Sequence, residues 1–532
     1  MTSESVRTAT VSRRRVLQAT AALGALGALG STRTPATAVP GGAGKTAAVI
    51  GTGFGGSVAA LRLGQAGFRT TVFERGRRWD IRKDGNTFPS ITKLDGRASW
   101  FAGQVSLGGP AGIPVAKYPG LLDQIKGNGI DSVYGAGVGG GSLVFGAFTS
   151  TPRKQDFEHV FPGGTGYDEL KRVYYPRALK MLNASKLPAD ILAHPNYVGA
   201  RSWAKTVRRY GAHLRTFEYA VDWDIVRAEL AGRATPSFSI GEMGFGANSG
   251  AKNSTDHNYL PAAERTGNVT IKPMHEVFEI RPRGNRPGFV VKAREIDYQH
   301  RTVRIVTADV DYVFLGAGSF HTTRLLVEAR AKGHLPKLSG KIGDGFGANG
   351  DFLTARTGLT DDYGPVQGGP GYGRFYDDDF PGGPVSMVYH STPLPYPTGK
   401  LLTTNLIQVF SPERGTIDYN RSTGTAELNY PFAEHTSILD RRGNSFANHF
   451  ARRAGGVPIV SRLAGFGSAS TYHGLGGVVI NQAADLNGAV RGYDNLYVVD
   501  GAFMPGEVGL VNPSLTIAAT AERTMDRFVA TH

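Results

Sequence analysis

The sequence predicts an α/β fold, in which a Rossmann-type dinucleotide-binding domain is joined to a discontinuous α+β domain built on an antiparallel sheet. A short apolar strand, a glycine turn, a helix pattern and a second strand follow one another between Ala47 and Glu74. Strand patterns return between Val269 and Leu315, and the chain ends with a buried strand and an amphipathic helix. Because 532 residues are too many for one ordinary core, we expect two domains.

The N-terminal residues have the pattern of an export signal. Arg13-Arg14-Arg15 precede a run of mostly Ala, Leu and Gly from Ala19 to Gly30, and Ala36-Thr37-Ala38 resembles a cleavage site. The apolar run is shorter than the roughly 20 residues that a bilayer-spanning helix needs. We therefore expect residues 1–38 to be a twin-arginine signal peptide and the mature protein to be secreted, without a membrane anchor.

The first strand, expected at Ala47–Ile50, leads into the turn Gly51-x-Gly53-x-x-Gly56. In such a turn the first glycine makes the bend, the second leaves room for a pyrophosphate, and the third lets the helix and the strand pack closely. These three glycines therefore predict the phosphate site of a bound dinucleotide.

The helix and strand after this turn complete the βαβ unit. The helix, expected at Ser57–Ala66, would offer unpaired N–H groups and the positive end of its dipole to the phosphates. Glu74 ends the second strand, Thr70–Phe73, where it is placed to accept hydrogen bonds from ribose hydroxyls. An acid at this position argues against the 2′-phosphate of NADP.

Three further segments favour FAD over NAD. Leu315–Ser319 ends a strand with small residues, as expected where a second strand edge meets the adenosine. Gly135–Ser142 offers consecutive small residues where backbone must lie against a flat ring. Leu496–Gly501 is a buried strand that ends on the acid Asp500, and it leads to Asn512-Pro513.

The Asn512-Pro513 step predicts the start of the last helix. Asn512 is expected to be its N-cap and Pro513 its first residue, with the helix running through Met525. The positive end of this helix would lie at the pyrimidine edge of a flavin and stabilise the negative charge that develops on reduction. An ordinary structural helix cap is the alternative.

Segments with two kinds of sequence pattern alternate along the chain, and this alternation defines the expected domains. The FAD-binding domain is predicted to comprise residues 39–81, 125–150, 250–350 and 467–532, and the substrate domain residues 82–124, 151–249 and 351–466. Further strands are expected at Val269–Ile271, Val277–Pro282, Phe289–Ala293, Thr302–Thr307 and Tyr312–Leu315.

Composition limits the chemistry and the partners. The chain has no Cys, which excludes thiol chemistry, iron–sulfur clusters and a cysteinyl flavin link, and we predict no metal site. The formal net charge is +15, but the basic residues are scattered, with Arg208-Arg209, Arg441-Arg442 and Arg452-Arg453 among the densest pairs. We therefore expect contact with anionic lipid surfaces rather than nucleic acid, and a monomeric protein.

The ordered motifs resemble those of the glucose–methanol–choline (GMC) oxidoreductases and, within that family, the secreted bacterial cholesterol oxidases that bind FAD non-covalently. The resemblance runs from about Ala47 to the C-terminus. It rests on Gly51–Gly56, Glu74, Gly137–Leu143, Phe314–Ser319, Tyr472–Gly477, Asp500-Gly501 and Asn512-Pro513.

The resemblance implies roles for individual residues. A His at the position of His473 faces the flavin and hydrogen-bonds the substrate hydroxyl, and an Asn at the position of Asn512 completes the contact. Hydride leaves the carbinol carbon only as the hydroxyl proton is taken up, so a group that titrates near neutral pH helps, and which group is the base stays open. Besides the glycine turn and Asn512-Pro513, the FAD contacts map onto Phe54, Glu74, Gly141, Gly146, Val277, Asp500 and Gly501.

Two departures from that pattern affect the expected activity. Cholesterol oxidases of the family carry a Glu two residues before a Thr-or-Ala-Pro step, and this Glu moves the proton that converts the Δ5 ketone to the Δ4 enone. Here the stretch reads Tyr389-His390-Ser391-Thr392-Pro393, so His390 is the candidate in its place and isomerisation is in doubt. Phe145 stands where those enzymes have an Asn beside the flavin, so oxygen access and redox tuning are expected to differ.

The resemblance therefore implies an exported FAD-dependent oxidase. Its expected substrate is a hydrophobic secondary alcohol, with a 3β-hydroxysterol such as cholesterol the first choice, and O2 would be reduced to H2O2. Two alternatives stay open, namely a dehydrogenase of another alcohol that passes electrons to a quinone, and a catalytically silent flavoprotein that binds lipid or a partner.

Overall fold

A computed structural model describes residues 44–105, 112–392, 399–433, 436–459 and 469–532. The predicted signal peptide at residues 1–38 and Pro393 lie outside this set. Within the described ranges no helix has the length and apolar character needed to cross a membrane.

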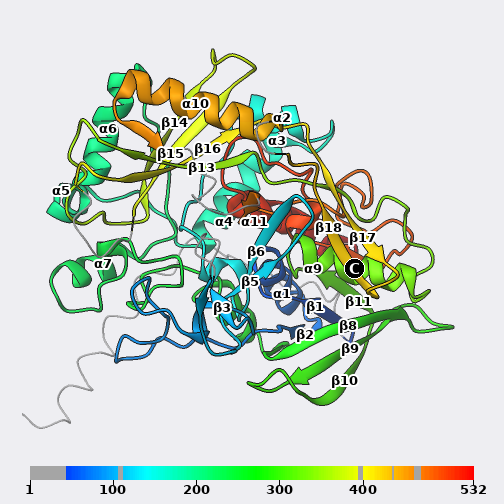
Figure 1. Ribbon diagram of the computed structural model, residues 1–532. Helices are drawn as coiled ribbons and strands as arrows, with labels where there is room; N and C mark the ends of the chain where they lie inside the picture. Colours follow the sequence, from blue (N-terminus) through cyan, green and yellow to red (C-terminus); the bar gives the residue numbers. More distant parts are fainter. Residues whose placement is uncertain (1–43, 106–111, 393–398, 434–435, 460–468) are drawn as a thin grey trace, which may run out of the picture. The chain divides into compact units, whose positions relative to one another are not determined.

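A five-stranded parallel sheet carries the nucleotide-binding motif (Figure 1). Its strand order is β21-β11-β1-β2-β7, and every ladder in it is parallel. The strands are β1 (Thr46–Ile50), β2 (Arg69–Phe73), β7 (Val269–Lys272), β11 (Tyr312–Leu315) and β21 (Leu496–Val498). This arrangement confirms the Rossmann-type fold, and each strand lies within two residues of its expected position.

Helices cover this sheet because its central strand is apolar on both faces. Ala47, Ala48 and Val49 have no exposed surface, as is usual for a parallel strand packed on both sides. Helix α1 (Phe54–Gln65) packs against α11 (Ser514–Thr531) and α8 (Tyr259–Glu264). Helix α1 starts at Phe54, directly after Gly53, rather than at the expected Ser57. Its N-terminus therefore lies at the carboxyl end of β1.

A three-stranded antiparallel sheet connects β7 to β11. Its order is β10-β9-β8, with β8 at His275–Pro282, β9 at Phe289–Ile296 and β10 at Thr302–Val310. Helix α9 (Ser319–Ala331) follows β11 and packs on β8. The strands expected here are present, each longer than its sequence pattern indicated.

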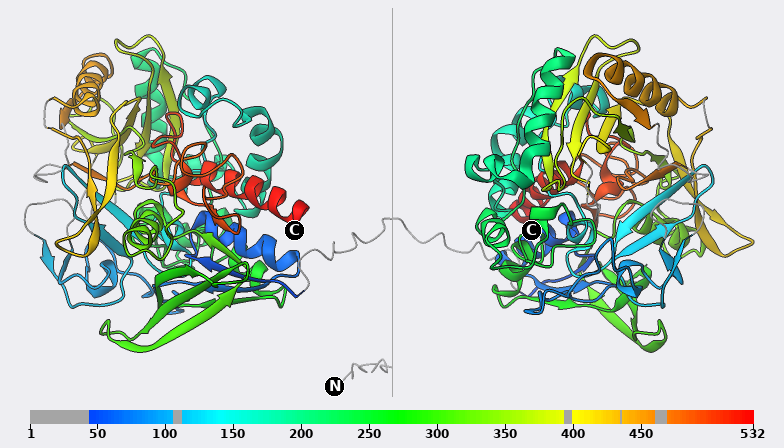
Figure 2. Two further views of the ribbon diagram at one scale, coloured as in Figure 1. Left: turned by 90° about the vertical axis from the view of Figure 1, so that its right-hand side faces the viewer. Right: turned by 60° about the vertical axis from the view of Figure 1, so that its left-hand side comes forward.

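A second five-stranded sheet, antiparallel throughout, is formed by strands between residues 351 and 459 (Figures 1 and 2). The order is β14-β15-β16-β13-β19, and helices α6 (Val198–Tyr210) and α10 (Ile438–Ala454) pack against it. The strands are β13 (Asp351–Thr357), β14 (Gly371–Asp377), β15 (Val385–His390), β16 (Thr403–Val409) and β19 (Val457–Ile459). This sheet confirms the antiparallel architecture predicted for the substrate domain.

Shorter elements connect these layers. Small sheets are formed by β3 (Gln104–Val105), β4 (Ile113–Pro114), β5 (Leu122–Ile125), β6 (Ile130–Gly135), β12 (Asp344–Phe346), β17 (Gly415–Asn420), β18 (Thr425–Asn429) and β20 (Ala469–Thr471). The remaining α-helices are α2 (Lys154–Val160), α3 (Tyr167–Glu169), α4 (Tyr175–Met181), α5 (Ala189–Ala193) and α7 (Trp223–Leu230).

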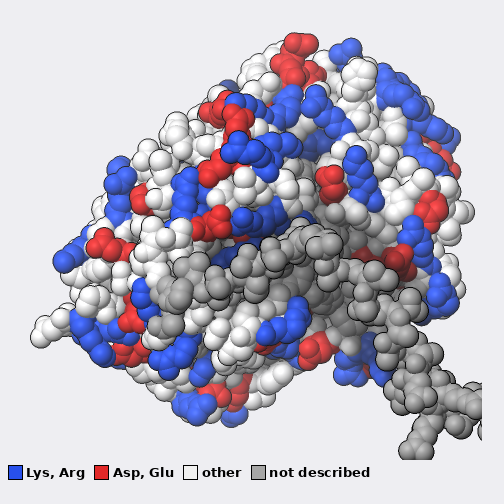
Figure 3. Space-filling model, turned by 180° about the vertical axis from the view of Figure 1, so that it is seen from behind, with Lys and Arg blue, Asp and Glu red and all other residues white. Residues whose placement is uncertain are grey.

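Basic side chains are distributed over the surface. On the face that Figure 3 shows, Lys and Arg are scattered and interspersed with Asp and Glu. Such mixing weakens the field that a single basic block would create.

Candidate active site

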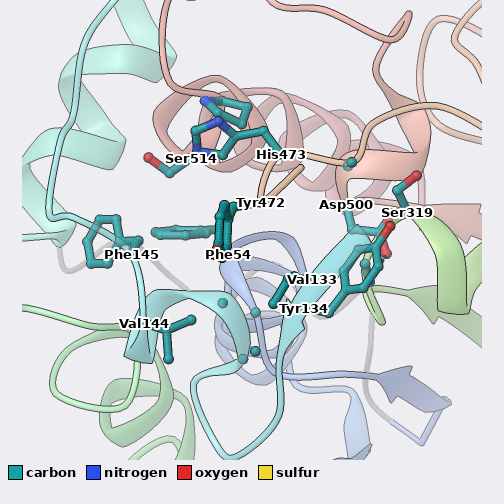
Figure 4. Close-up of a pocket in the computed structure, with 18 of the residues that line it drawn as sticks. Phe54, Val133, Tyr134, Val144, Phe145, Ser319, Tyr472, His473, Asp500 and Ser514 are labelled. Carbon is teal, nitrogen blue, oxygen red and sulfur yellow. Dashed lines mark hydrogen bonds between the residues drawn. The ribbon is translucent and has the colours of Figure 1, made fainter. Parts of the chain in front are cut away.

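A cavity of about 660 Å³ lies along the carboxyl ends of the parallel strands and extends to the antiparallel sheet (Figure 4). Open α/β sheets bind their ligands at this edge. Its wall contains all but one of the residues predicted to bind cofactor or substrate, namely Gly51, Gly53, Phe54, Glu74, Gly141, Gly146, Val277, His390, His473, Asp500, Gly501, Asn512 and Pro513. The exception is Gly56.

The three glycines of the turn differ in the space that a side chain would have. Gly53 has free space beside it (an open position), whereas Gly51 and Gly56 do not (closed positions). A Cβ on Gly51 would lie 2.3 Å from the Gly316 carbonyl oxygen, and one on Gly56 would lie 2.1 Å from the Gly51 carbonyl oxygen. Gly51 also has a φ of +95°, which favours glycine. A Cβ on Gly53, in contrast, would find its nearest neighbour 4.0 Å away. Thus Gly51 and Gly56 let the backbone segments approach, while Gly53 leaves space beside the cavity.

Glu74 is held by protein donors on both carboxylate oxygens. One oxygen accepts hydrogen bonds from the backbone N–H and hydroxyl of Thr52, at 3.1 and 2.6 Å, and the other from the N–H groups of Gly76 and Gly137, at 2.9 and 3.3 Å. Burial raises the pKa of this carboxyl, and these hydrogen bonds oppose the increase. Its carboxylate is thereby fixed at the cavity wall, and a ribose contact stays a prediction.

Three helices begin at the cavity. Helices α1 and α9 start beside Gly53 and Gly318, and α11 starts at Ser514. Each helix has an N-cap without a side-chain hydrogen bond. The positive dipole ends of these three helices therefore face a region that suits negative charge.

The predicted N-cap role of Asn512 is wrong. Helix α11 begins at Ser514, after Pro513, and extends to Thr531 rather than Met525. The Asn512 amide oxygen instead accepts a hydrogen bond of 2.8 Å from the buried Arg374 guanidinium. A hydrogen bond from a cation is stronger than one from a neutral N–H, which explains why the side chain turns away from the helix.

Asp500 fixes the backbone at the end of β21. It accepts hydrogen bonds from the N–H groups of Gly318 and Ala502, at 2.7 and 2.9 Å, and from the Thr322 hydroxyl at 2.5 Å. Complete burial raises the pKa of Asp500 to about 6, and these hydrogen bonds oppose the increase. The acid predicted at this strand end thus joins β21 to the start of α9.

Aromatic and small residues form the wall beyond the glycine turn. The rings of Phe54 and Phe145 meet edge to face at 5.2 Å, and a Cβ on Gly141 would meet no atom within 4 Å. Tyr472 belongs to the same wall, where 56% of its surface is exposed and its side chain lies beside Phe54 (Figure 4).

These features fit FAD. A pyrophosphate would lie at Gly53 and the start of α1, and a planar ring system would lie against Gly141, Phe54 and Tyr472. Open glycines, helix N-termini and an exposed aromatic face in one cavity match a phosphate-containing ligand with a flat ring.

His473 has a carboxylate partner. Its Nδ1 is hydrogen-bonded to Asp351 at the start of β13. Because a carboxylate only accepts, Nδ1 carries the hydrogen, and Nε2 of the neutral ring is left as the acceptor. The other oxygen of Asp351 accepts from Gln408 Nε2 at 2.8 Å and from Asn349 Nδ2 at 3.2 Å.

Arg374 organises the region around Asn512. Besides Asn512, its guanidinium donates to the Ser386 hydroxyl at 2.6 Å, to the Leu510 carbonyl at 2.7 Å and to the Gln408 side-chain oxygen. Burial lowers the pKa of Arg374, and the charge of Asp351 opposes this. Since a guanidinium only donates, the oxygen of Asn512 must face Arg374 and its NH2 group must point elsewhere.

His390 lies at the end of β15 in the same wall. Its Nε2 is buried without a hydrogen-bond partner, and its ring lies 4.6 Å from that of Phe148. Burial lowers the pKa of His390 to about 3, and the charges of His473 and Arg374 add to this. The imidazole is therefore neutral near neutral pH, and its Nε2 is enclosed by the protein.

The sequence interpretation missed Asp351, Gln408 and Arg374. The available signal was a charged or amide residue inside an otherwise apolar strand pattern, such as Arg374 in Gly371–Asp377 or Gln408 in Thr403–Val409. Nothing in the sequence shows that these strands lie side by side.

Comparison with known proteins agrees with the fold and with the nucleotide-binding motif. Residues 459–521 match the family model described as GMC oxidoreductase, and residues 49–105 match an NAD(P)-binding Rossmann-like domain. Cholesterol oxidase of Mycobacterium tuberculosis (strain CDC 1551 / Oshkosh) is 26% identical, with 89% of each chain covered. Cholesterol oxidase of Acinetobacter baumannii is 25% identical, with 91% of this chain and 94% of that protein covered.

Solved structures share the fold at lower identity. A pyridoxine 4-oxidase from Mesorbium loti aligns with a TM-score of 0.60 and 16% identity, covering 92% of this chain and all of that one. A fungal aryl-alcohol oxidase aligns with a TM-score of 0.61 and 14% identity, covering 91% and 98%. These matches show a GMC oxidoreductase domain at residues 459–521 and a Rossmann-like nucleotide-binding domain at residues 49–105, and together with the motif order and the cavity they support an FAD-dependent alcohol oxidase.

Proposed function

We propose that this oxidase acts on a hydrophobic secondary alcohol, with a 3β-hydroxysterol such as cholesterol the first candidate. The alcohol would become the ketone while O2 becomes H2O2, so two electrons and two protons leave the substrate. The observation that carries the proposal is that His473 and Asn512 lie in the wall of the cavity that the glycine turn opens into. Apolar side chains lie around them, including Met243, Leu353 and Leu406.

The sterol class is supported by relatives rather than by the cavity alone. The curated relatives at 25–26% identity are named cholesterol oxidases and are matched over most of their length. An apolar wall suits a ligand with one hydroxyl and a large hydrocarbon body, because burying that body stabilises the complex by about 25 cal/mol per Å².

The side chains would handle the hydroxyl proton. His473 Nε2 would accept it as the C–H bond breaks, and the Asn512 NH2 group would donate a hydrogen bond to the substrate oxygen. The chemistry supplied by bound FAD, which we propose is held non-covalently, is acceptance of the hydride and return of two electrons to O2. Apolar neighbours exclude water from the reacting carbon.

We further propose that the oxidation stops mainly at the Δ5 ketone. Isomerisation needs a base that removes a proton and returns it, and His390, with its pKa lowered to about 3, is a weak one.

The test is a product analysis. Holoenzyme is incubated with cholesterol, and H2O2, cholest-5-en-3-one and cholest-4-en-3-one are measured over time. We expect peroxide and the Δ5 ketone, and we expect His390→Glu to raise the Δ4 fraction. Rapid Δ4 enone formation by the wild type would contradict the role given to His390, and the absence of any sterol product would remove the substrate claim.

Export and domain boundaries also stay proposals. We propose that residues 1–38 direct the folded, FAD-loaded protein through the twin-arginine pathway. We also propose two discontinuous domains. The FAD-binding domain would consist of segments 39–81, 125–150, 250–350 and 467–532, and the substrate-binding domain of segments 82–124, 151–249 and 351–466. Processing of the N-terminus can be read by mass spectrometry of the protein recovered outside the cell.

A further inference from the structure

A buried chain of hydrogen bonds joins the two proposed reactive side chains from behind the cavity wall. It runs from His473 to Asp351, from Asp351 to Gln408, from Gln408 to Arg374 and from Arg374 to Asn512. The exposed fraction is 0% for Gln408 and 1% for Arg374. Polar side chains therefore form a continuous hydrogen-bonded set from His473 to Asn512, in which the Nε of Arg374 is the buried atom without a partner.

The register of the antiparallel sheet brings these side chains together. Asp351 on β13 is the Cα partner of Gln408 on β16, and Gln408 is the partner of Ser386 on β15. The next strand, β14, contributes Arg374, which also donates to Ser386. Directly opposed residues on neighbouring strands have side chains on the same face, so four strands of the substrate sheet contribute to one network.

The network connects a partly buried carboxylate and a buried guanidinium through an amide. Asp351 is an anion beside the cavity and Arg374 is a cation behind it, and Gln408 donates to the first while it accepts from the second. An amide side chain can do both at once, because its NH2 group donates and its oxygen accepts. Replacing any member leaves a buried polar group unpaired, which makes the arrangement sensitive to its geometry.

One end of the network sets the tautomer of His473, and the other end sets the orientation of the Asn512 amide. At one end, Asp351 holds the hydrogen on His473 Nδ1, so that Nε2 can accept a proton, and it stabilises the imidazolium that results. At the other end, Arg374 takes the oxygen of Asn512, so that the amide presents its NH2 group. One set of interactions thus produces an acceptor and a donor in the same cavity wall.

We propose that Asp351, Gln408 and Arg374 are positioning residues that set the tautomer of His473 and the amide orientation of Asn512 together. This inference rests on the proposed function for the use of these two groups. The hydrogen-bonding states themselves do not depend on which alcohol is oxidised. The two claims can therefore fail separately.

Other charges near the pair must be considered in any pH measurement. Charged or titratable groups that interact electrostatically with His473 or Asp351 include His390 from β15, Arg374 from β14 and Glu507 from the loop before α11. Burial raises the pKa of Glu507 to about 7, and the charge of Asp351 adds to this. His390 is neutral above about pH 3, and Arg374 stays cationic, so neither titrates near neutral pH.

The first experiment compares Asp351→Asn with the wild type and uses Asp418→Asn as its control. Asp418 is exposed on β17 and lies outside the cavity wall, so its variant loses the same charge without touching His473. Spectra of protein labelled with ¹⁵N-histidine report the tautomer, and the His473 signal is assigned by its loss in His473→Asn. We expect Asp351→Asn alone to shift His473 away from the Nδ1–H form.

The second experiment follows flavin reduction by substrate against pH. We expect the maximal rate in Asp351→Asn to fall on the order of 10²–10⁴-fold. We also expect the acid limb of its profile to move to lower pH, because the imidazolium loses its carboxylate. Asp351→Glu should restore part of the rate and the position of the limb.

Two results would overturn the inference. One is an unchanged His473 tautomer in Asp351→Asn, whatever the activity of the protein. The other is a lower rate with an unmoved acid limb, which is the outcome of a structural role alone. If no alcohol reduces the flavin, the proposed function fails, while the tautomer spectra still decide the inference.

Discussion

The two ends of the cavity are built by different means. At the nucleotide end the shape comes from backbone, because Gly51 and Gly56 let segments approach and Gly53 leaves space. At the other end, side chains from several strands converge on His473 and Asn512. The first end depends on consecutive residues and the second on strand register. Changes at the first should therefore alter cofactor retention, and changes at the second should alter rate.

The largest expected effect is at the side-chain end. His473→Asn should lower the rate of flavin reduction by alcohol on the order of 10²–10⁴-fold, because the side chain proposed to accept the hydroxyl proton is removed. FAD content, read from the absorbance of the purified protein, should stay unchanged. His213→Asn, at an exposed position, is the matched control. A His473→Asn protein that oxidises alcohol at the wild-type rate would remove the contrast between the two ends.

A smaller effect on stability is expected from Asp500. Its pKa is raised from 3.8 to about 6 because folding buries the carboxylate. The folded state is therefore favoured while the group is protonated, and this contribution is lost as the pH rises from the unfolded pKa through the folded one. FAD-free protein should lose about 3 kcal/mol of unfolding free energy over this window from Asp500.

Urea unfolding at pH 4 and pH 7 measures this term. The difference between the two pH values should be smaller in Asp500→Asn than in the wild type, because the asparagine does not titrate. Asp418→Asn controls for the loss of an exposed carboxylate. An identical pH dependence in wild type and Asp500→Asn would show that burial does not shift this group.

The smallest effects are expected from single methyl groups in the backbone-built end. Gly56→Ala should destabilise the fold by about 1–3 kcal/mol, because its Cβ would meet the Gly51 carbonyl oxygen. Gly141→Ala meets no atom within 4 Å, so its melting temperature without FAD should match the wild type while FAD retention falls. Equal behaviour of the two variants would show that the closed and open glycines do not differ as described.

The end of the cavity that is built from consecutive residues could be predicted from the sequence better than the end that is built from several strands. The glycine turn, Glu74 and the strand that ends on Asp500 are local patterns, and each lies in the structure within two residues of its expected place. The start of α11 was misjudged, because Asn512 has a stronger partner in Arg374, which is 138 residues away in the chain. Local capping preferences give way to a charge-assisted bond between distant segments.

The side-chain end could be predicted only in part. His473, Asn512 and His390 were found through family motifs, and the structure brings all three into one wall. Their partners Asp351 and Gln408 were not found, because they meet through the pairing of β13 with β16. Register between strands is set by the packing of the whole sheet and is not contained in either strand's own pattern.

The most direct test of the central claim is an anaerobic titration of the purified yellow holoenzyme with alcohols. Cholesterol and simple secondary and primary alcohols are added without O2, and the flavin absorbance is followed. We expect cholesterol to bleach the flavin, with O2 restoring the colour and releasing about one H2O2 per flavin reduced. If no alcohol reduces the flavin, the assignment of the His473 and Asn512 end of the cavity to alcohol oxidation is contradicted.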